Sequence, residues 1–180
     1  MANLVAVILA AGKGTRMRSK YPKVLHKVGG KPMLQHVIDA ASEAGCDEKV
    51  IIVGHEAELV EEMVGSQGKI ALQAEQLGTG HAVMQTAEAL KGFSGTALIL
   101  CGDTPLLEGA ELKKFCESHQ ASGAAATVLT AIMDDPFGYG RIVRDAKGNV
   151  QAIVEQKDAT EEQKAIKEIN TGIYCMECPL

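Results

Sequence analysis

Three short polar segments carry the residues of this chain that are best suited to chemistry, and each follows an apolar run. The first, "LAAGKGTRM" (Leu9–Met17), holds two glycines and two basic residues. The second, "LQAEQLGTGHA" (72–82), holds a glutamine and a Gly-Thr-Gly run, and the third, "LCGDTPLL" (100–107), holds an aspartate. These residue types are suited to contacts with phosphates, with polar ligand edges and with hard cations.

The glycine-containing segment does not match either common phosphate-binding fingerprint. Met17 stands where the third glycine of a dinucleotide-binding motif is required, and no Gly-Lys-Ser/Thr run at Walker spacing is present. Gly12 and Gly14 are compatible with a backbone cradle for phosphate oxygens, to which Lys13 and Arg16 add charge-assisted contacts. A tight strand-to-helix turn with solvated cations is the alternative interpretation.

The second segment offers an amide where an apolar run ends. Gln73 can donate and accept hydrogen bonds, as the edge of a uracil requires, and the flanking glycines, Gly78 and Gly80, permit the close approach of a base or ribose. The alternative is a capped helix start with a solvent-facing amide.

The aspartate of the third segment follows the apolar run "TALILC". A carboxylate beside a phosphate cradle favours an intervening hard cation, and Mg²⁺ is bound by one or two carboxylates together with substrate phosphates. Asp103 is therefore a candidate metal ligand. The alternative is that it caps a helix beginning near Pro105.

Apolar runs and helical periodicity alternate along the first 132 residues. Because the strands are apolar on both faces, the pattern predicts an α/β fold: a Rossmann-like, three-layer α/β/α sandwich around a mostly parallel sheet. In that fold ligands bind beyond the carboxyl ends of the strands, where the three segments lie. Strands are predicted at 4–10, 49–54, 69–73, 96–101 and 124–132, and helices at 32–45, 56–64, 80–90 and 108–121.

The pattern changes after Asp135. Two alternating strands, "YGRIVRD" and "VQAIVEQ", flank the turn "AKGN", which predicts a late β-hairpin insertion. A polar helix at 160–168 and a strand at 169–175 follow. No linker is evident, so residues 1–180 are expected to form a single domain.

Composition narrows the class of protein. The chain has 180 residues, 46% of them hydrophobic, and a net charge of -5, which argues against a general nucleic-acid binder. Its longest apolar run has eight residues, so no membrane insertion is expected. Five cysteines are an odd number without disulfide-framework spacing, which predicts reduced thiols and a cytoplasmic location. The pair Cys175/Cys178 lacks the second pair that a zinc site needs.

Seven segments together resemble the bacterial UDP-N-acetylglucosamine pyrophosphorylases, members of the sugar nucleotidylyltransferases. They are, in order, "LAAGKGTRM", "PKVLH", "GGKPMLQHV", "LQAEQLGTGHA", "GYGRIV", "IVEQKDAT" and "INTGIY". The resemblance covers nearly the whole chain and implies the fold of nucleotide-diphospho-sugar transferases. It also implies uridylyl transfer from UTP to N-acetylglucosamine 1-phosphate, which yields UDP-N-acetylglucosamine and pyrophosphate for peptidoglycan and lipopolysaccharide synthesis, with Mg²⁺ as cofactor.

The resemblance assigns roles residue by residue. It implies catalytic roles for Arg16, Lys23 and Asp103, with Asp103 holding Mg²⁺. The implied nucleotide-binding residues are Leu9, Ala10, Ala11, Gly12, Gly14, Thr15, Lys23, Gln73, Gly78 and Thr79, and the implied sugar-binding residues are Gly140, Glu155 and Asn170. Cys101 departs from the pattern, because many relatives have a tyrosine there.

In these relatives the domain continues further and supplies an asparagine as a second metal ligand, so the chain is expected to be truncated after Leu180. A β-helical acetyltransferase domain, through which full-length relatives form homotrimers, is absent from this sequence.

The expected mechanism is direct in-line attack of the sugar phosphate on the α-phosphorus of UTP, aided by positioning and charge neutralisation. The five histidines are expected to be structural or surface residues. Two alternatives stay open: another sugar-phosphate or molybdenum-cofactor nucleotidyltransferase, and a non-catalytic nucleotide-binding module.

Overall fold

A computed structural model describes residues 3–14 and 17–179, and the chain divides into two compact units. Unit 1 comprises residues 1–127 and 174–180, and unit 2 comprises residues 128–173. Two strands, β7 (Ala126–Ile132) and β10 (Glu168–Cys178), each begin in one unit and continue in the other.

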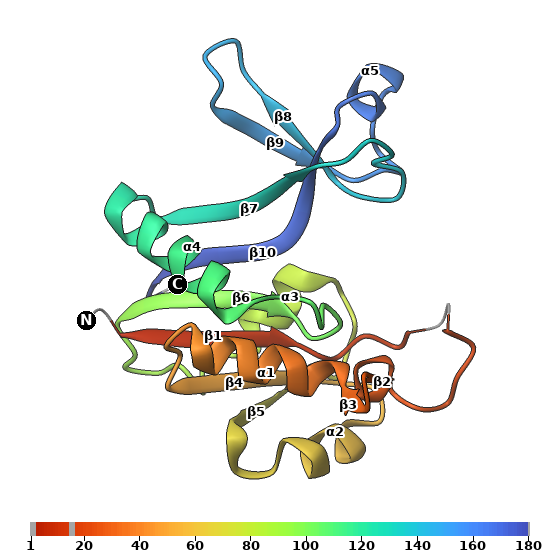
Figure 1. The fold of residues 1–180 in the computed structure, drawn as a ribbon, viewed down its shortest axis with the longest axis vertical. Coiled ribbons are helices and arrows are strands. Elements are labelled where there is room, and N and C mark those ends of the chain that lie inside the picture. The colour runs from red at the N-terminus through yellow and green to blue at the C-terminus, as the bar shows by residue number, and fades with distance from the viewer. Residues whose placement is uncertain (1–2, 15–16, 180) are drawn as a thin grey trace. The chain divides into compact units, whose positions relative to one another are not determined.

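Unit 1 is built on a mostly parallel sheet with the order β5-β4-β1-β6-β10 (Figure 1). Strand β1 (Leu4–Leu9) runs parallel to β4 (Glu48–Val53) and to β6 (Gly95–Cys101). Strand β5 (Lys69–Leu72) adds parallel to β4, whereas residues 174–178 of β10 pair antiparallel with β6. The predicted parallel strands are confirmed to within one residue at most ends.

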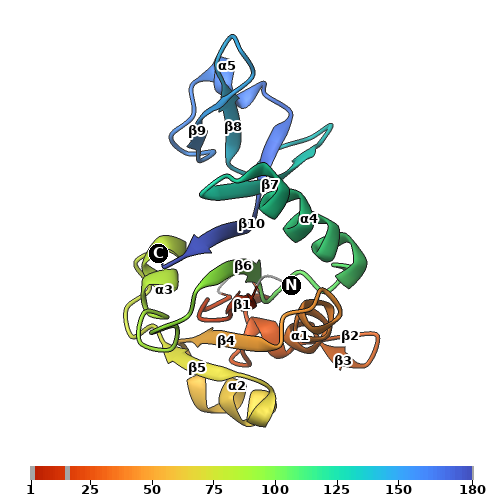
Figure 2. The ribbon, with the colours of Figure 1, turned by 90° about the vertical axis from the view of Figure 1, so that its left-hand side faces the viewer.

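Helices cover both faces of this sheet, as Figure 2 shows. Helices α1 (Met33–Glu43) and α4 (Gly109–Ser122) pack against each other on one face, and α3 (Thr79–Met84) lies on the other. Helix α2 (Ala57–Val64) contacts β4 and continues into the short helix η3 (Gly65–Gln67). The three-layer sandwich predicted from the sequence is confirmed.

The apolar run of strand β1 is continuous because the strand is buried on both faces. Val5 and Val7 belong to a cluster that includes Ala82 of α3, and both are fully buried. Ala6 and Ile8 are equally buried and, because side chains alternate along a strand, point to the opposite face. Burial on both faces leaves no place for a polar residue on this strand.

The sequence analysis did not predict a small hairpin that precedes α1. Strands β2 (Lys27–Val28) and β3 (Lys31–Pro32) pair antiparallel across Gly29 and Gly30. Both glycines have positive φ, 59° and 84°, as a two-residue type I′ turn requires.

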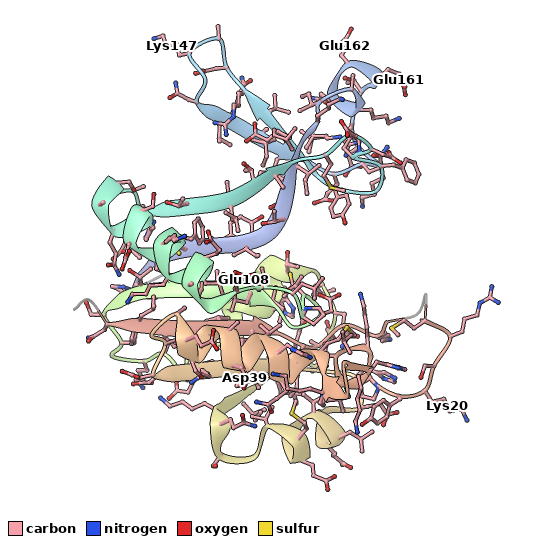
Figure 3. All side chains as sticks on the ribbon, viewed as in Figure 1. Lys20, Asp39, Glu108, Lys147, Glu161 and Glu162 are labelled. Atoms are coloured by element: carbon pink, nitrogen blue, oxygen red, sulfur yellow. The ribbon has the colours of Figure 1, made fainter. Side chains whose placement is uncertain are left out.

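Unit 2 contains the predicted late hairpin, formed by β8 (Arg141–Arg144) and β9 (Val150–Val154) in antiparallel register. Ile169 of β10 pairs antiparallel with Arg141 of β8. Helix α5 (Glu161–Lys164) begins with a capping box between Thr160 and Gln163. Its acidic residues Glu161 and Glu162 lie on its exposed outer side (Figure 3).

Two helices end well before their predicted ends. Helix α3 ends at Met84 rather than near 90, because the N–H groups of Gln85 and Thr86 bond to carbonyls three residues back, the hydrogen-bond spacing of 3₁₀ turns. Helix α5 spans four residues instead of nine, since the N–H of Ile166 bonds to the carbonyl of Gln163 and the chain then enters β10. No helix in the described residues is long and apolar enough to cross a membrane.

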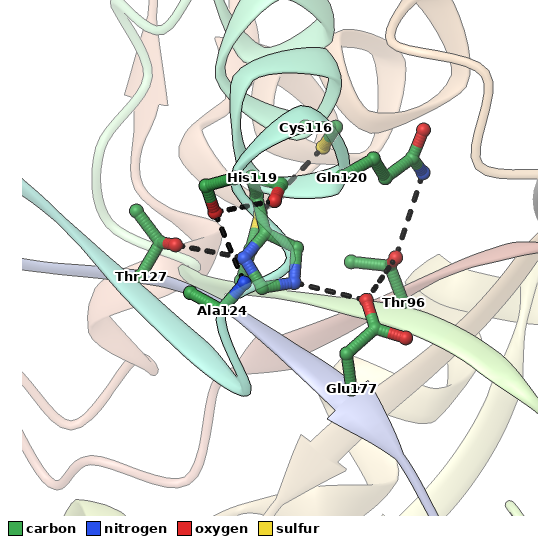
Figure 4. A network of polar contacts seen from close by, with 9 residues as sticks. Thr96, Cys116, His119, Gln120, Ala124, Thr127 and Glu177 are labelled. Atoms are coloured by element: carbon green, nitrogen blue, oxygen red, sulfur yellow. Dashed lines mark hydrogen bonds and ion pairs between the residues drawn. The ribbon is translucent and has the colours of Figure 1, made fainter.

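A buried polar network within unit 1 ties α4 to three strands (Figure 4). The imidazole of His119, which has no exposed side-chain surface, places Nδ1 2.7 Å from Thr127 Oγ1 and Nε2 3.0 Å from Glu177 Oε1. Thr96 donates a 2.9 Å hydrogen bond to the same Glu177 oxygen. Satisfied buried polar groups of this kind hold elements in register, which gives His119 a structural role.

Cys175 and Cys178 lie on opposite faces of β10. The Sγ atom of Cys175 lies 3.8 Å from that of Cys116, whereas Cys178 packs in the cluster around Val5 and Val7. Residues three apart on a strand point to opposite sides, so these two thiols do not share a ligand. Among the residues that the structure describes, no cluster of three metal-binding side chains occurs. None of the five cysteines, all of which lie within the described residues, forms a disulfide.

Candidate nucleotide-binding site

A cleft of about 410 Å³ opens in unit 1 at the carboxyl ends of β1, β5 and β6. Parallel strands of an open α/β sheet direct their following loops to this edge. Nine of the residues predicted from the sequence line the cleft: Leu9, Ala11, Gly12, Gly14, Lys23, Gln73, Gly78, Thr79 and Asp103. Four others also line it but were not predicted: Val24, Gln76, Ala82 and Cys101.

The glycine loop lies against Lys23. Gly14 has φ +57°, and a Cβ built on it would lie 2.7 Å from the Cβ of Lys23, closer than two carbons can approach. Glycine is therefore required here on two grounds, its left-handed conformation and this close approach. Thr15 and Arg16, both predicted from the sequence, lie outside the described residues.

Ala10 was predicted to bind the nucleotide but does not line the cleft. Its N–H donates a 2.8 Å hydrogen bond to Ile52 O of β4, and its side chain is buried. Its place is therefore structural, because it continues the β1–β4 pairing beyond the end of β1.

Lys23 and Asp103 form an ion pair in the cleft, although 80 residues separate them. Lys23 opens the short helix η2 (Lys23–Leu25), whose Val24 and Leu25 are buried and anchor it. The side chains of Lys23 and Asp103 keep 33% and 32% of their surface exposed, so both remain accessible to a ligand. The alternative that Asp103 caps a helix is wrong, since Glu108 is the N-cap of α4.

Lys23 differs from the other basic residues of this segment in its position. Lys13 is exposed, and Lys20 lies on an exposed loop that extends from unit 1 (Figure 3). Neither residue lines the cleft. Among the described residues, Lys23 is the cation that the cleft contains.

The amide of Gln73 is held inside the protein. Gln73 is 3% exposed, and its Nε2 donates to Gly78 O at 3.1 Å and lies 3.1 Å from His81 Nδ1. The backbone N–H of Gln73 continues the β4–β5 ladder to Val53 O. A solvent-facing amide, the alternative interpretation, is therefore wrong.

Cys101 adds a thiol to the cleft at the end of β6. Burial, and to a smaller extent the charge of Asp103, raise the pKa of Cys101 to about 11. The thiol is therefore neutral near pH 7 and is a poor nucleophile. This agrees with the expectation that the chemistry needs no covalent intermediate.

The three predicted sugar-binding residues lie together within unit 2. A Cβ built on Gly140 would lie 3.2 Å from Glu155 Oε1, so the glycine leaves room for that carboxylate. The N–H of Asn170 donates a 2.8 Å hydrogen bond to Gly140 O, and Asn170 Oδ1 accepts from Gly172 N at 3.0 Å. The structure thus brings together the carboxylate of Glu155, the amide of Asn170 and the backbone of Gly140, which has no side chain.

Arg141 supports this group and was not singled out from the sequence. It is 2% exposed, and its guanidinium donates to Tyr139 O, to Gln156 Oε1 at 2.8 Å and to Lys164 O at 3.3 Å. The arginine thereby ties the loop before β8 to the segment after β9 and to α5. The one signal in the sequence was its place directly after Gly140 in the hairpin motif.

The fold is that of an α/β protein of the nucleotide-diphospho-sugar transferase type. Residues 5–178 match the nucleotidyl transferase family, and the chain belongs to that family. The match runs across both compact units.

Within this family, the chain is similar to proteins called GlmU. It is 56% identical over 177 residues to "Bifunctional protein GlmU" of Bacillus cereus (strain AH187), and 56% identical over 175 residues to the GlmU of Pelotomaculum thermopropionicum. These alignments cover 98% and 97% of this chain. The chain spans 39% and 38% of the length of those relatives.

Solved structures with this fold are more distant in sequence. HddC from Yersinia pseudotuberculosis superposes with a TM-score of 0.74 at 23% identity, covering 98% of this chain and 77% of that one. A UDP-glucose pyrophosphorylase complexed with UDP-glucose superposes with a TM-score of 0.76 at 21% identity, covering 98% and 76%. At this level of identity the likeness establishes the fold.

Proposed function

We propose that this chain transfers a uridylyl group from UTP to N-acetylglucosamine 1-phosphate and releases pyrophosphate. The observation that carries the proposal is the cleft, which unites the glycine loop, Lys23, Gln73 and Asp103 from four separate segments. The family match and the 56% identity to GlmU proteins support it. A product of this kind would serve as a precursor for cell-envelope polymers.

The reaction is an in-line displacement at phosphorus. An oxygen of the sugar phosphate forms a bond to the α-phosphorus of UTP as the bond from that phosphorus to the bridging oxygen of pyrophosphate breaks. Both reactants are anions, so the protein must reduce their repulsion and hold them in line. The ammonium of Lys23 and the N–H groups of the glycine loop supply positive charge and donors for this purpose. Arg16 is proposed to add a second cation.

Asp103 fits a magnesium ion. Its carboxylate pairs with a cation, the ammonium of Lys23. Asp103 follows the carboxyl end of β6 and lines the cleft together with the glycine loop. One carboxylate completed by phosphate oxygens is a usual binding mode for Mg²⁺. When bound, the ion would neutralise charge on the phosphates.

The remaining roles follow the chemistry of each side chain. Gln73 is proposed to contact the base, and Gly78 and Thr79 the nucleoside. Glu155 is proposed to accept hydrogen bonds from sugar hydroxyls, with Asn170 and the backbone at Gly140 completing the sugar contacts. Reduced cysteines agree with a reducing compartment such as the cytoplasm, which we propose as the location.

The deciding experiment measures pyrophosphate. The protein, Mg²⁺, UTP and N-acetylglucosamine 1-phosphate are combined, and each component is omitted in turn. Release that requires all of them supports the proposal, whereas nucleotide binding without release indicates a non-catalytic module. Competition by CTP, ATP and other sugar phosphates separates the proposal from related transferases.

Gln73→Ala tests the base contact. The preference for UTP over CTP should fall by about 1–3 kcal/mol, the usual cost of an unpaired buried group. A variant with unchanged preference would show that backbone groups read the base.

A further inference from the structure

The amide of Gln73 has a defined orientation that two acceptors impose. Its nitrogen lies 3.1 Å from Gly78 O and 3.1 Å from His81 Nδ1. A carbonyl oxygen only accepts hydrogen bonds, so the contact with Gly78 identifies the nearer amide atom as the –NH₂ group. The carboxamide oxygen therefore points the other way.

We assign the tautomer of His81 from the same contact. With the Gln73 –NH₂ group facing Nδ1 at 3.1 Å, that ring nitrogen is assigned as the acceptor, which places the proton of the neutral imidazole on Nε2. The half-buried amide of Gln85 lies 3.2 Å from Nε2 and also donates to the His81 carbonyl at 3.0 Å. The amides of Gln73 and Gln85 thus both approach the ring with –NH₂ groups and compete for its single acceptor nitrogen; the assignment to Nδ1 gives that acceptor to the more deeply buried amide, Gln73.

These contacts leave the oxygen of the Gln73 amide, Oε1, without a partner in the described part of the protein. Both contacts of the amide use Nε2, and within the described residues Oε1 has no hydrogen bond to the protein and keeps a small exposed surface. Gln73 lines the cleft, so this acceptor oxygen is available to a ligand there.

We infer that His81 is a positioning residue for base selection: by accepting from Gln73 it holds the amide oxygen toward the base. The inference rests on the proposed function, because it assumes that a pyrimidine occupies this part of the cleft. An acceptor oxygen matches the N3–H donor of uracil and opposes the N3 acceptor of cytosine. His81 touches neither base nor phosphate in this scheme.

The size of the effect follows from the cost of turning the amide. To bind cytosine, Gln73 must rotate, lose its hydrogen bonds to Gly78 and His81, and place its oxygen against both acceptors. Removal of the His81 acceptor lowers this cost by about one neutral hydrogen bond, which corresponds to roughly fivefold in relative affinity. The contact with Gly78 remains, so preference for uracil should be reduced and not abolished.

The first test examines the protein without nucleotide. Nitrogen-15 NMR of the histidine rings at mildly alkaline pH, with His81 assigned by substitution, should show a protonated Nε2 and an unprotonated Nδ1. Protonation on Nδ1 would mean that Gln73 presents its –NH₂ group to the cleft, and the inference would be overturned. This result does not depend on whether the protein is an enzyme.

The second test compares equilibrium binding of UTP and CTP by calorimetry for two variants at one position. His81→Leu removes the acceptor and should lower the UTP:CTP affinity ratio by about fivefold. His81→Asn keeps an oxygen near the place of Nδ1 and should retain most of the ratio. His55→Leu, the same change at an exposed histidine outside the cleft, is the matched control.

The outcomes are separable. Equal ratios in all variants, or equal losses in the leucine and asparagine variants, would overturn the role of His81. If the wild-type protein binds neither nucleotide, the proposed function fails, while the NMR experiment still decides the orientation of the amide. Circular dichroism spectra confirm that each variant is folded before its affinity is compared.

Discussion

Gly14→Ala is the substitution that most directly tests how the cleft is built. The new methyl group would lie 2.7 Å from Lys23 Cβ, and one of the two must retreat by about 0.7 Å to reach an ordinary contact of 3.4 Å. The variant also adopts a left-handed φ of +57°, which costs about 1–2 kcal/mol for an L-residue. Overpacking adds about 1–3 kcal/mol.

Gly29→Ala separates the two contributions. Gly29 has nearly the same φ, +59°, but a Cβ built on it has no atom within 4 Å. The Gly29→Ala variant therefore incurs only the conformational cost. The melting temperature of this variant should fall by roughly 2–4 °C per kcal/mol of lost stability. The melting temperature of Gly14→Ala should fall about twice as far.

Nucleotide binding should distinguish the variants more sharply than stability. A displacement approaching 1 Å of a charge that contacts phosphate lowers rates by up to about 100-fold, so Gly14→Ala should lose UTP affinity and turnover. Gly29→Ala should keep both. Thermal melts by circular dichroism, calorimetric titration with UTP and pyrophosphate release measure the three quantities. The reasoning is refuted if Gly14→Ala binds UTP as tightly as Gly29→Ala does.

Four further outcomes are expected. Asp103→Asn removes charge while keeping shape, so Mg²⁺-dependent pyrophosphate release should be lost with an unchanged circular dichroism spectrum; retained activity would remove Asp103 from the metal site. Lys23→Ala should slow turnover by about a hundredfold or more, the effect of losing one preorganised charge, and near-normal rates would indicate a merely solvated cation. Because the pKa of Cys101 is raised to about 11, its alkylation by iodoacetamide should accelerate as pH rises toward that value, and UTP should slow the reaction; a fast reaction at pH 7 would contradict the half-buried, neutral thiol. Thr127→Val leaves a buried nitrogen of His119 without its partner, so the free energy of unfolding in urea should fall by about 1–3 kcal/mol, and an unchanged value would mean that water replaces the hydroxyl.

The elements that form the sheet were predictable because their signals are local. Strand β1 is an uninterrupted apolar run, and α1 and α4 show helical periodicity between recognisable ends, so the alternation of elements indicated a parallel sheet covered on both faces. The prediction was weakest where the sequence allows a longer helix than the structure has. After Met84 the chain turns through 3₁₀-type bonds that helical periodicity does not reveal.

The loops of the site were likewise predictable in position and in chemistry. A glycine pair, an amide and a carboxylate each followed a strand, and the carboxyl edge of a parallel sheet collects such loops. Nine of the predicted residues line one cleft for that reason.

The sequence by itself determined the order of elements, the double-sided burial of the sheet and the residue types at its carboxyl edge, since each depends on near neighbours in the chain. Tertiary structure alone decided that Lys23 reaches Asp103 across 80 residues, that Gly14 packs on Lys23, and that the Gln73 amide lies 3.1 Å from His81. Side-chain direction is set by whichever distant atoms fill the surrounding space and satisfy its polar groups. Those atoms become neighbours only after the sheet has formed, and therefore local pattern does not specify them.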